Sequence, residues 1–458
     1  MGKKYDFQYI VIGSGPAGSA AAIELAKQKK RVAIVEGRFF GGANLNTRDL
    51  PYAVALDFSH TYRKILSYPE LSNQDIHFNF PTVSARQLKV VVEAGGNNKQ
   101  PFEQAGVTCI KGFANLLDKH TIAVNEQKYT ADCFILATGA KLKVLEIAGT
   151  ENVDYLTPES AIKVRRLPKV VAVVGAGASG CEIAEYYAEL GVKTLLFEMA
   201  EHILPREDIE AGNTLSNYFA QKLGITVLPN CRVVALEEDA ISKRIIFRSE
   251  ESEKTVRVDT IVLATGSQPV LDYGLENAGV KYRATGIIVD KCFQTSAKNI
   301  YAIGDCLGQE SSTERARQEG LALASILITK AKTPLNYQGF TRYINTFPEV
   351  AVVGLNEYDL AKRDRKYKKC IVDLDTLIIS HVENFHHGFV KLITDKNNRI
   401  IGATIVAPKA SLMATELALA VRHGLTALEL ASTPHIYNSY SYAIKIAAKE
   451  LAMNKRKK

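Results

Sequence analysis

Two stretches of the chain repeat one order of apolar and polar positions. Residues 7–37 (FQYIVIGSGPAGSAAAIELAKQKKRVAIVEG) and 169–199 (KVVAVVGAGASGCEIAEYYAELGVKTLLFEM) each show an apolar strand, a G-x-G-x-x-G turn, an amphipathic helix and a second apolar strand. A glutamate stands at the end of each second strand. Because all of these elements occur together, each stretch predicts a β-α-β unit that binds a dinucleotide. The chain is therefore predicted to hold two dinucleotide sites.

The three glycines of each turn have distinct predicted tasks. The first permits the tight turn after the strand, the second lets a pyrophosphate approach the backbone, and the third lets helix and strand pack closely. The N-terminus of the following helix offers free N–H groups and a positive dipole end to the phosphates. The predicted contacts are Gly13, Gly15, Pro16, Ala17 and Gly18 in the first unit and Gly175, Gly177 and Gly180 in the second.

The glutamates that end the two units indicate the ribose contacts. Glu36 and Glu198 can each accept two hydrogen bonds from ribose hydroxyls. A carboxylate repels a 2′-phosphate, and Glu201 adds a second acidic group near Glu198, whereas Arg206 lies several residues later. The second site is therefore predicted to take NADH in preference to NADPH.

Later strands are predicted to return to these units. FILATGAK (134–141) and IVLATGSQP (261–269) are apolar strands that end in Ala-Thr-Gly, which places Gly139 and Gly266 near the two cofactors. NIYAIGDCLG (299–308) delivers Asp305 at the C-terminal end of a strand, where open parallel sheets place ligand groups.

From about Tyr337 onward no dinucleotide signal appears, and the pattern changes to that of an antiparallel sheet with packed helices. The turn DKNNR is predicted to join two alternating strands, and MATELALAVRHGLTALELA (413–431) resembles a helix. The predicted fold class is α/β, with two Rossmann-like dinucleotide-binding domains followed by a C-terminal α+β domain.

Composition restricts the remaining possibilities. The chain has 458 residues, with 47% hydrophobic and 23% charged residues, and it contains neither a membrane-spanning apolar run nor a signal-peptide pattern, so we expect a cytoplasmic protein. Its formal charge is +8 and it ends in NKRKK, but no nucleic-acid motif accompanies this charge. Seven cysteines lie far apart without a C-x-x-C pair and are predicted to be buried thiols. No metal site is predicted, because His386 and His387 are adjacent and, on a strand, would face opposite sides.

With these motifs, nearly the whole chain resembles the two-dinucleotide-binding flavoproteins, the pyridine nucleotide-disulfide oxidoreductases such as dihydrolipoamide dehydrogenase, glutathione reductase and mercuric reductase. The resemblance implies an FAD-binding domain over residues 1–150 that continues at 268–335. It also implies an NAD(P)H-binding domain over 151–267 and a dimerisation domain over 336–458 that forms a homodimer. Asp305 would bind the ribityl chain. Further residues placed at the cofactors by this resemblance are Gly42, Asn46, Ala114 and Thr313 for FAD and Val233 for NADH.

The sequence departs from the family where the redox cysteines stand. The family pattern is roughly G-G-T-C-x-N-x-G-C-x-P-S-K, and this chain has GGANLNTRDLPYA at residues 41–53. Asn44 and Asp49 occupy the cysteine positions, and Ala53 replaces the lysine near the flavin. Since neither asparagine nor aspartate forms a disulfide, the dithiol relay is predicted to be absent.

A second departure lies near the C-terminus. The family disulfide reductases carry H-P-x-x-x-x-E, a base with its orienting carboxylate, and here Tyr437, Asn438 and Tyr442 stand at those positions. Tyrosine, with a pKa of about 10, is a poor base at neutral pH. Tyr437, Tyr440 and Tyr442 are predicted to form an aromatic cluster, either stacking on a planar acceptor or packing in the interface. Tyr437 favours the quinone-reductase or transhydrogenase type of relative.

The predicted activity is therefore FAD-dependent oxidation of NADH, with electrons passed directly to a small acceptor such as a quinone, oxygen or a dye. Glu182 and Tyr437 are the candidate catalytic residues. In the family, the glutamate matching Glu182 pairs with the lysine that Ala53 replaces, so either Arg48 takes that role or Glu182 is rearranged. Two alternatives remain: a soluble nicotinamide transhydrogenase, and a catalytically weak flavin-binding sensor or partner protein.

Overall fold

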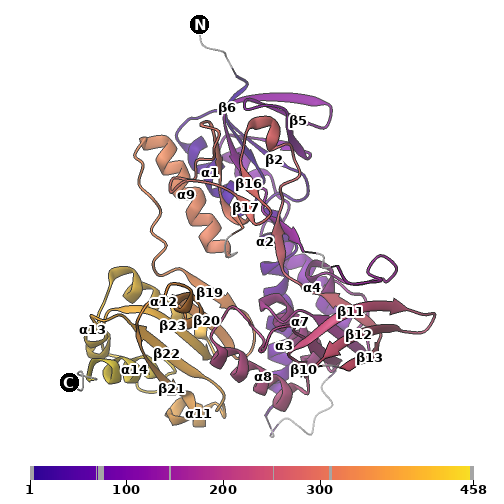
Figure 1. Ribbon diagram of the computed structural model, residues 1–458, viewed down its shortest axis with the longest axis vertical. Coiled ribbons are helices and arrows are strands. Elements are labelled where there is room, and N and C mark those ends of the chain that lie inside the picture. The colour runs from indigo at the N-terminus through magenta and orange to yellow at the C-terminus, as the bar shows by residue number, and fades with distance from the viewer. Residues whose placement is uncertain are drawn as a thin grey trace. The chain divides into compact units, whose positions relative to one another are not determined.

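The computed structural model describes residues 5–68, 70, 77–143, 146–250, 252–308 and 312–453 (Figure 1). Its chain divides into two compact units. The first comprises Met1–Val54, Thr82–Lys143 and Gly266–Asn336, and the second comprises Ala55–Pro81, Val144–Thr265 and Tyr337–Lys458. The chain thus enters each unit several times, as the return of Asp305 to the first unit requires.

The first unit is built on a mixed sheet in the order β3-β2-β1-β6-β5-β4, with β18 also paired to β6. β1, β2, β3, β6 and β18 pair in parallel, and β4, β5 and β6 pair antiparallel. The strands are β1 (Phe7–Ile12), β2 (Val32–Glu36), β3 (Val107–Lys111), β4 (Ala114–Leu116), β5 (Thr121–Val124), β6 (Gln127–Leu136) and β18 (Ile300–Ala302).

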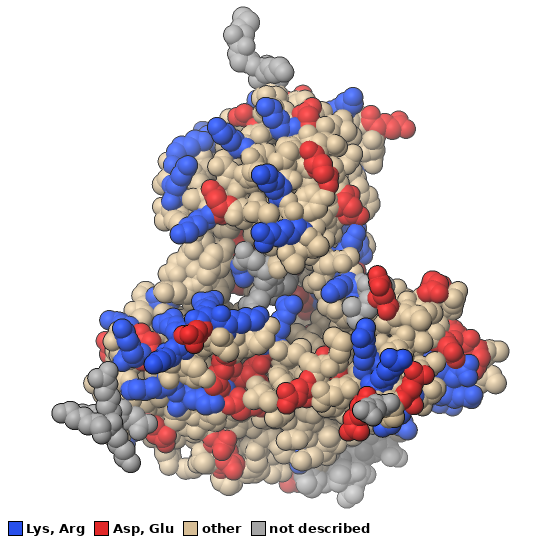
Figure 2. All heavy atoms as spheres, in the orientation of Figure 1, with Lys and Arg blue, Asp and Glu red and all other residues tan. Residues whose placement is uncertain are grey.

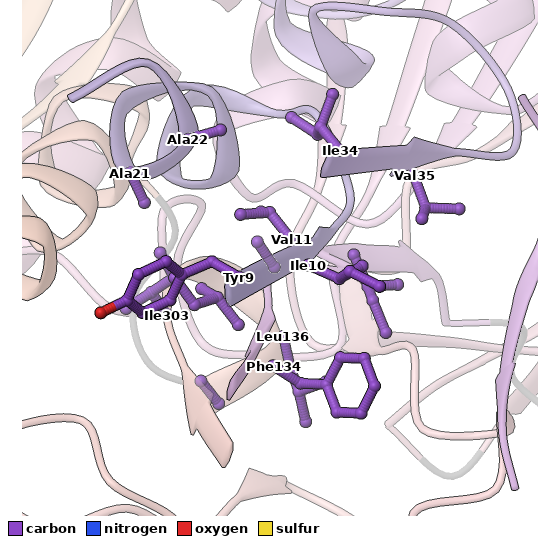
Figure 3. Packing of buried hydrophobic residues seen from close by; sticks show 14 of the residues in the cluster. Tyr9, Ile10, Val11, Ala21, Ala22, Ile34, Val35, Phe134, Leu136 and Ile303 are labelled. Atoms are coloured by element: carbon purple, nitrogen blue, oxygen red, sulfur yellow. The ribbon is translucent and has the colours of Figure 1, made fainter. Parts of the chain in front are cut away.

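Helix α1 (Pro16–Lys27) crosses from β1 to β2 and packs against α9 (Thr313–Thr329). Ile10 and Val11 of β1 lie within one buried cluster with Ala21 and Ala22 of α1 and side chains of β2 and β6 (Figure 3). The unit also contains α2 (Gly42–Asn46), α5 (Gln100–Gln104), η2 (Glu276–Ala278), η3 (Gly304–Leu307), the pair β7 (Ala140–Leu142) with β15 (Ser267–Pro269), and the pair β16 (Tyr282–Arg283) with β17 (Gly286–Ile287). Two helices, α3 (Asp49–Leu66) and α4 (Phe80–Glu93), have residues in both units.

The second unit contains a smaller parallel sheet in the order β10-β9-β8-β14. Its strands are β8 (Val170–Val174), β9 (Lys193–Phe197), β10 (Thr226–Leu228) and β14 (Thr260–Leu263). Helix α7 (Ala178–Glu189) connects β8 to β9 as α1 connects β1 to β2. The remaining elements are α6 (Pro158–Ala161), α8 (Ile209–Leu223) and the antiparallel strands β11 (Cys231–Glu238), β12 (Lys243–Ser249) and β13 (Ser252–Val258).

The C-terminal part of this unit is an antiparallel sheet in the order β19-β20-β23-β22-β21, with α12 and α14 packed on it. Its strands are β19 (Thr341–Ile344), β20 (Glu349–Gly354), β21 (Lys368–Asp373), β22 (Phe389–Thr394) and β23 (Ile400–Ala407). Its helices are α10 (Glu357–Lys362), η4 (Leu374–Thr376), α11 (Ile378–Val382), α12 (Ala410–His423), α13 (Ala427–Ser432) and α14 (Tyr442–Met453). The predicted fold class is confirmed.

Two details of this sheet region were predicted wrongly. DKNNR does join β22 and β23, but both strands are almost entirely buried instead of alternating, because elements cover both of their faces. The stretch at 413–431 forms two helices, since Gly424 ends α12 at a φ of 64° and Thr426 begins α13 with a capping box to Glu429.

The surface offers no extended region of one charge on the face shown, where basic and acidic side chains are interspersed (Figure 2). Of the helices in the described ranges, none is long and apolar enough to cross a membrane. The basic tail NKRKK lies outside the described residues.

A buried lysine anchors the C-terminal sheet to the N-terminus of α8. The ammonium of Lys391 on β22 is 0% exposed and lies 2.8 Å from Asp208 Oδ2, 2.8 Å from Glu210 Oε2 and 2.6 Å from Glu357 Oε2. Burial would raise the pKa of Glu357, but hydrogen bonds from Lys391, Tyr367 and Lys369 outweigh it and lower that pKa to about 2. The buried lysine is therefore compensated by carboxylates on two elements.

We expect Lys391→Met to lower the free energy of unfolding by about 3–5 kcal/mol, because removing one partner leaves buried carboxylates without their cation. Lys369→Met is the matched control: Lys369 touches Glu210 and Glu357 but is 41% exposed. It should cost about 1 kcal/mol or less. Urea titrations of both variants measure the difference, and equal losses would contradict a special role for Lys391.

Candidate functional site: two dinucleotide turns and a hydrogen-bonded cysteine-free loop

The two glycine turns have the same backbone geometry. Gly13 has a φ of 104° and Gly175 a φ of 99°, values that glycine adopts without strain. A Cβ on Gly13 would lie 2.2 Å from the carbonyl oxygen of Ala137, and one on Gly175 would lie 2.5 Å from that of Ala264. Ala137 and Ala264 open the two Ala-Thr-Gly segments, so each segment packs directly against its own turn.

The third glycine of each turn lets the following helix pack closely against the turn. A Cβ on Gly18 would lie 2.0 Å from the Gly13 carbonyl oxygen, and one on Gly180 would lie 1.8 Å from that of Gly175. No larger side chain fits without moving the helix away from the turn. The helix N-terminus is thereby held close to the end of the strand.

The second glycine of each turn faces open space. A Cβ on Gly15 or Gly177 would meet no protein atom within 4 Å. Both residues are helix N-caps without a side-chain cap, so their helices present backbone N–H groups that no cap side chain takes up. This combination fits a pyrophosphate at each turn.

Glu36 and Glu198 each accept hydrogen bonds from the glycine turn of their own β-α-β unit. Glu36 Oε2 accepts hydrogen bonds from the Ser14 N–H at 3.0 Å and the Ser14 hydroxyl at 2.6 Å, and Oε1 accepts one from the Arg38 N–H at 2.7 Å. Glu198 accepts from the N–H groups of Ala176, at 2.8 Å, and Ala200, at 2.9 Å. Glu36 Oε1 and both oxygens of Glu198 accept one of these bonds each and keep a further lone pair, so ribose binding remains compatible with them.

The other predicted FAD contacts belong to the first unit. Asn46 is buried and donates to the carbonyl oxygens of Phe40, at 3.0 Å, and Gly42, at 2.8 Å, which fixes the loop before α3. Asp305 is half-buried in η3, directly after β18, and Thr313 is the first residue of α9. The remaining members are Ala114 in β4 and Gly139, where a Cβ would meet open space.

The two further residues predicted for NADH are separated by the unit boundary. Val233 is buried in β11 of the second unit, whereas Gly266 is the first residue of a segment of the first unit. Their roles at the nicotinamide site stay predictions.

The positions predicted to replace the cysteines are joined by hydrogen bonds. Asn44 Nδ2 lies 2.7 Å from Asp49 Oδ2 and 2.9 Å from Thr313 Oγ1, and the Thr313 hydroxyl in turn donates to Asp49. Ala53 is exposed, one turn into α3. The seven cysteines are all free, and five of them are buried: Cys133, Cys181, Cys231, Cys306 and Cys370.

The predicted catalytic residues lie in the second unit. Glu182 is half-buried and accepts a hydrogen bond from the Asn345 N–H at 2.9 Å, so it is not a freely solvated helix carboxylate. Tyr437 is 61% exposed and meets Tyr442 edge to face at 5.0 Å between ring centroids. Tyr440 is buried and packs against Phe385. The prediction of one cluster of three tyrosines was therefore wrong: Tyr437 contacts Tyr442, and Tyr440 contacts Phe385.

One histidine–carboxylate pair escaped prediction. His435 Nε2 lies 2.6 Å from Glu416 Oε1, and Nδ1 lies 2.9 Å from the Thr433 carbonyl oxygen. Both ring nitrogens of His435 therefore lie within hydrogen-bond distance of an oxygen atom of the chain. The two residues are 19 positions apart, and no sequence spacing signals their contact.

Comparison with known proteins gives the class. Residues 7–320 match the pyridine nucleotide-disulphide oxidoreductase family, and residues 341–448 match the dimerisation domain of that family. The chain therefore belongs to the pyridine nucleotide-disulphide oxidoreductases. The family binds FAD and NAD(H), in agreement with the two turns and with the predicted NADH preference.

The chain is similar to dihydrolipoyl dehydrogenase of Bacillus subtilis, with 28% identity over 97% of this chain and 96% of the relative. It is 27% identical to mercuric reductase of Bacillus cereus over 97% of this chain and 71% of the relative. Among solved structures, LpdA from Mycobacterium tuberculosis superposes with a TM-score of 0.86, 26% identity and coverage of 97% and 99% of the two chains. The flavoprotein disulfide reductase RclA from Escherichia coli shares the fold, with a TM-score of 0.85, 22% identity and coverage of 98% and 100%.

Gly15→Ala should separate FAD binding from folding. The added methyl group meets no protein atom, but it occupies the space through which the pyrophosphate approaches the backbone. We expect a folded protein with FAD occupancy lowered by about tenfold, which corresponds to about 1.4 kcal/mol. Flavin absorbance per chain and circular dichroism measure the two quantities. Gly18→Ala is the contrast, because its methyl group meets the Gly13 carbonyl and should destabilise the fold itself.

Glu198→Gln should weaken the selection for NADH. The amide retains one acceptor oxygen but loses the charge that repels a 2′-phosphate. We expect the ratio of kcat/KM for NADPH over NADH to rise by about tenfold, mainly through KM for NADPH. Steady-state kinetics with both nucleotides measure it, and exposed Glu250→Gln is the control. An unchanged ratio in Glu198→Gln would contradict the assignment of Glu198.

Proposed function

We propose that this flavoprotein oxidises NADH and passes the electrons from FAD directly to a small acceptor, a quinone-type compound, without a dithiol relay. The single observation that carries the proposal is the bond between Asn44 Nδ2 and Asp49 Oδ2, 2.7 Å long, at the positions where the family pattern has its redox cysteines. Neither side chain can form or exchange a disulfide.

Thr313 supports this proposal from a distant part of the sequence. Its hydroxyl lies 2.9 Å from Asn44 Nδ2 and donates to Asp49, so three side chains form one closed polar set. Thr313 is 269 residues from Asn44 in the sequence, so this hydrogen bond depends on the packing of α9 beside the loop. The bonds within the set take both Asn44 N–H groups and the Thr313 hydroxyl proton, so the set keeps acceptor oxygens on Asn44 and Asp49 for a hydroxyl group of a polar substrate.

The C-terminal residues support the same proposal. Disulfide exchange requires an acid–base group beside the thiolate. Tyr437 and Tyr442, at the family's histidine and glutamate positions, meet as an edge-to-face aromatic pair. His435 does not replace the missing base, because both of its ring nitrogens are already occupied by the Glu416 carboxylate and the Thr433 carbonyl oxygen.

The proposed assignment of residues follows the two turns. Residues 1–150 with 268–335 would hold FAD through Gly13, Gly15, Gly18, Glu36 and Asp305. Residues 151–267 would hold NADH through Gly175, Gly177, Gly180 and Glu198, and residues 336–458 would form the homodimer interface. When bound, FAD accepts a hydride from NADH and returns two electrons to the acceptor. The chain's part is to orient both nucleotides and, through Asn44, Asp49 and Thr313, to bind the acceptor's polar edge.

Acceptor choice tests the proposal. We mix the purified flavoprotein anaerobically with NADH, follow the loss of flavin absorbance, and then add menadione, a nicotinamide analogue, or the disulfides of lipoamide and glutathione. Menadione should restore the absorbance at least about a hundredfold faster than either disulfide, because positions 44 and 49 carry no thiol to exchange with a disulfide.

Alkylation provides the matched control. Treatment with iodoacetamide should leave NADH:menadione turnover unchanged to within about twofold, since the seven cysteines are free thiols with no role in the relay. Rapid reoxidation by a disulfide, or loss of turnover on alkylation, would overturn the proposal. Reoxidation by the nicotinamide analogue alone would identify a transhydrogenase, and no reduction by NADH would identify a flavin-binding sensor or partner protein.

A further inference from the structure

Helix α7 carries two carboxylates that its dinucleotide turn does not use. Glu185 and Glu189 are one helical turn apart and therefore project from the same face. Both side chains are buried, with 0% and 1% of their surface exposed. His60 of α3 meets them from outside the helix, and its side chain is 21% exposed.

The three side chains converge within the spacing of a metal site. His60 Nε2 lies 3.3 Å from Glu185 Oε2 and 3.8 Å from Glu189 Oε2, and one ligand atom from each residue lies within 4.8 Å of the others. Bond lengths of about 2.0–2.2 Å to a zinc-type ion in tetrahedral geometry place neighbouring ligand atoms roughly 3.3–3.6 Å apart. The observed distances are close to this range without rearrangement of either helix.

One carboxylate oxygen of Glu189 accepts no hydrogen bond. Its Oε2 atom is buried and has no hydrogen-bond partner, although it points toward His60 and Glu185. An unpartnered buried carboxylate oxygen costs free energy, which a bound cation would remove. Glu185 differs, because both of its oxygens accept from the Phe347 N–H, at 2.9 and 3.0 Å, and this contact fixes its orientation.

The charges of the cluster are unbalanced. Burial, followed by the charge of Glu185, raises the pKa of Glu189 to about 8, and His60, Ser59 and Arg63 lower it only in part. Burial also raises the pKa of Glu185 well above its usual range, despite the hydrogen bond from Phe347. A divalent cation beside a neutral imidazole would balance both carboxylates and leave a site with no net charge.

We propose that His60, Glu185 and Glu189 bind a divalent transition-metal ion of the zinc type, which joins α3 to α7. Imidazole nitrogen and carboxylate oxygen are suitable ligands for Zn²⁺, and three protein ligands leave one position for water. Phe347 orients Glu185 as an outer hydrogen-bond partner orients a metal ligand. The His60 side chain is 21% exposed, so the ion can reach the site from this side.

The other acidic cluster in the described residues does not compete with this one. Asp208, Glu210 and Glu357 also converge, but the ammonium of Lys391 already lies among them. The contrast between the two clusters provides a control, because in each the ligand atoms lie within 4.8 Å of one another, but only the second cluster has a cation of the chain, Lys391, among its carboxylates.

The test uses the intact flavoprotein after treatment with EDTA and removal of the chelator. ZnCl₂ is titrated by calorimetry and against a chromogenic chelator, and thermal melting is recorded with and without Zn²⁺. We expect one ion per chain and a higher Tm with Zn²⁺, because binding to the folded state alone stabilises it. Glu189→Gln and His60→Gln should each weaken binding by about a hundredfold or more and abolish the Tm shift.

Three controls make the result decisive. Glu189→Gln should keep or raise the Tm without metal, since an amide removes a buried carboxylate, so lost binding cannot be attributed to unfolding. Glu210→Gln should leave Zn²⁺ affinity unchanged. Co²⁺ in place of Zn²⁺ should show a spectrum without a thiolate charge-transfer band, which excludes the free cysteines as ligands.

Absence of Zn²⁺ binding by the wild-type protein would overturn the proposal and identify His60 as the partner of carboxylates that retain a proton. Equal binding by the wild type, Glu189→Gln and His60→Gln would overturn it as well. No step of this test needs NADH or an electron acceptor, so its outcome is independent of the proposed function.

Discussion

Close backbone contact between a glycine turn and the end of a neighbouring strand is the constraint on which both dinucleotide sites depend. At Gly13 and Gly175 a Cβ would lie 2.2 and 2.5 Å from a carbonyl oxygen of the Ala-Thr-Gly segment. The turn, the helix N-terminus and the returning strand can be near one another only because these positions lack side chains. At Gly15 and Gly177 a Cβ would meet no protein atom within 4 Å, which leaves the room that a pyrophosphate would need at each turn.

Around this shared scaffold the two units use polar residues differently. In the first, the loop at 41–49 is closed by side-chain hydrogen bonds from Asn46, Asn44 and Thr313. In the second, ionisable groups are taken into the interior: Lys391 is surrounded by carboxylates, whereas Glu189 Oε2 accepts no hydrogen bond. Burying an ionisable group costs free energy unless another group pairs with it. Carboxylates of the chain pair with Lys391, and the metal ion proposed above would pair with Glu189.

Much of the fold could be predicted, and the misses have physical causes. The two β-α-β units were evident because strand, turn and helix are local in sequence and their patterns coincide. The break at Gly424 was missed because the apolar positions continue on both sides of it, whereas the αL conformation of one residue ends the helix. The alternation expected around DKNNR failed because packing on both faces buries every position of β22.

The sequence by itself determined the family and the two glycine turns, and it predicted the replacement of both cysteines, because each depends on residue type at fixed local spacing. Only the tertiary structure decided what those residues contact. It joined Asn44 and Asp49 to Thr313, paired His435 with Glu416, and placed His60 of α3 against two carboxylates of α7. These contacts span tens to hundreds of residues, and such pairings arise from packing between elements, for which a single sequence carries no periodic signal.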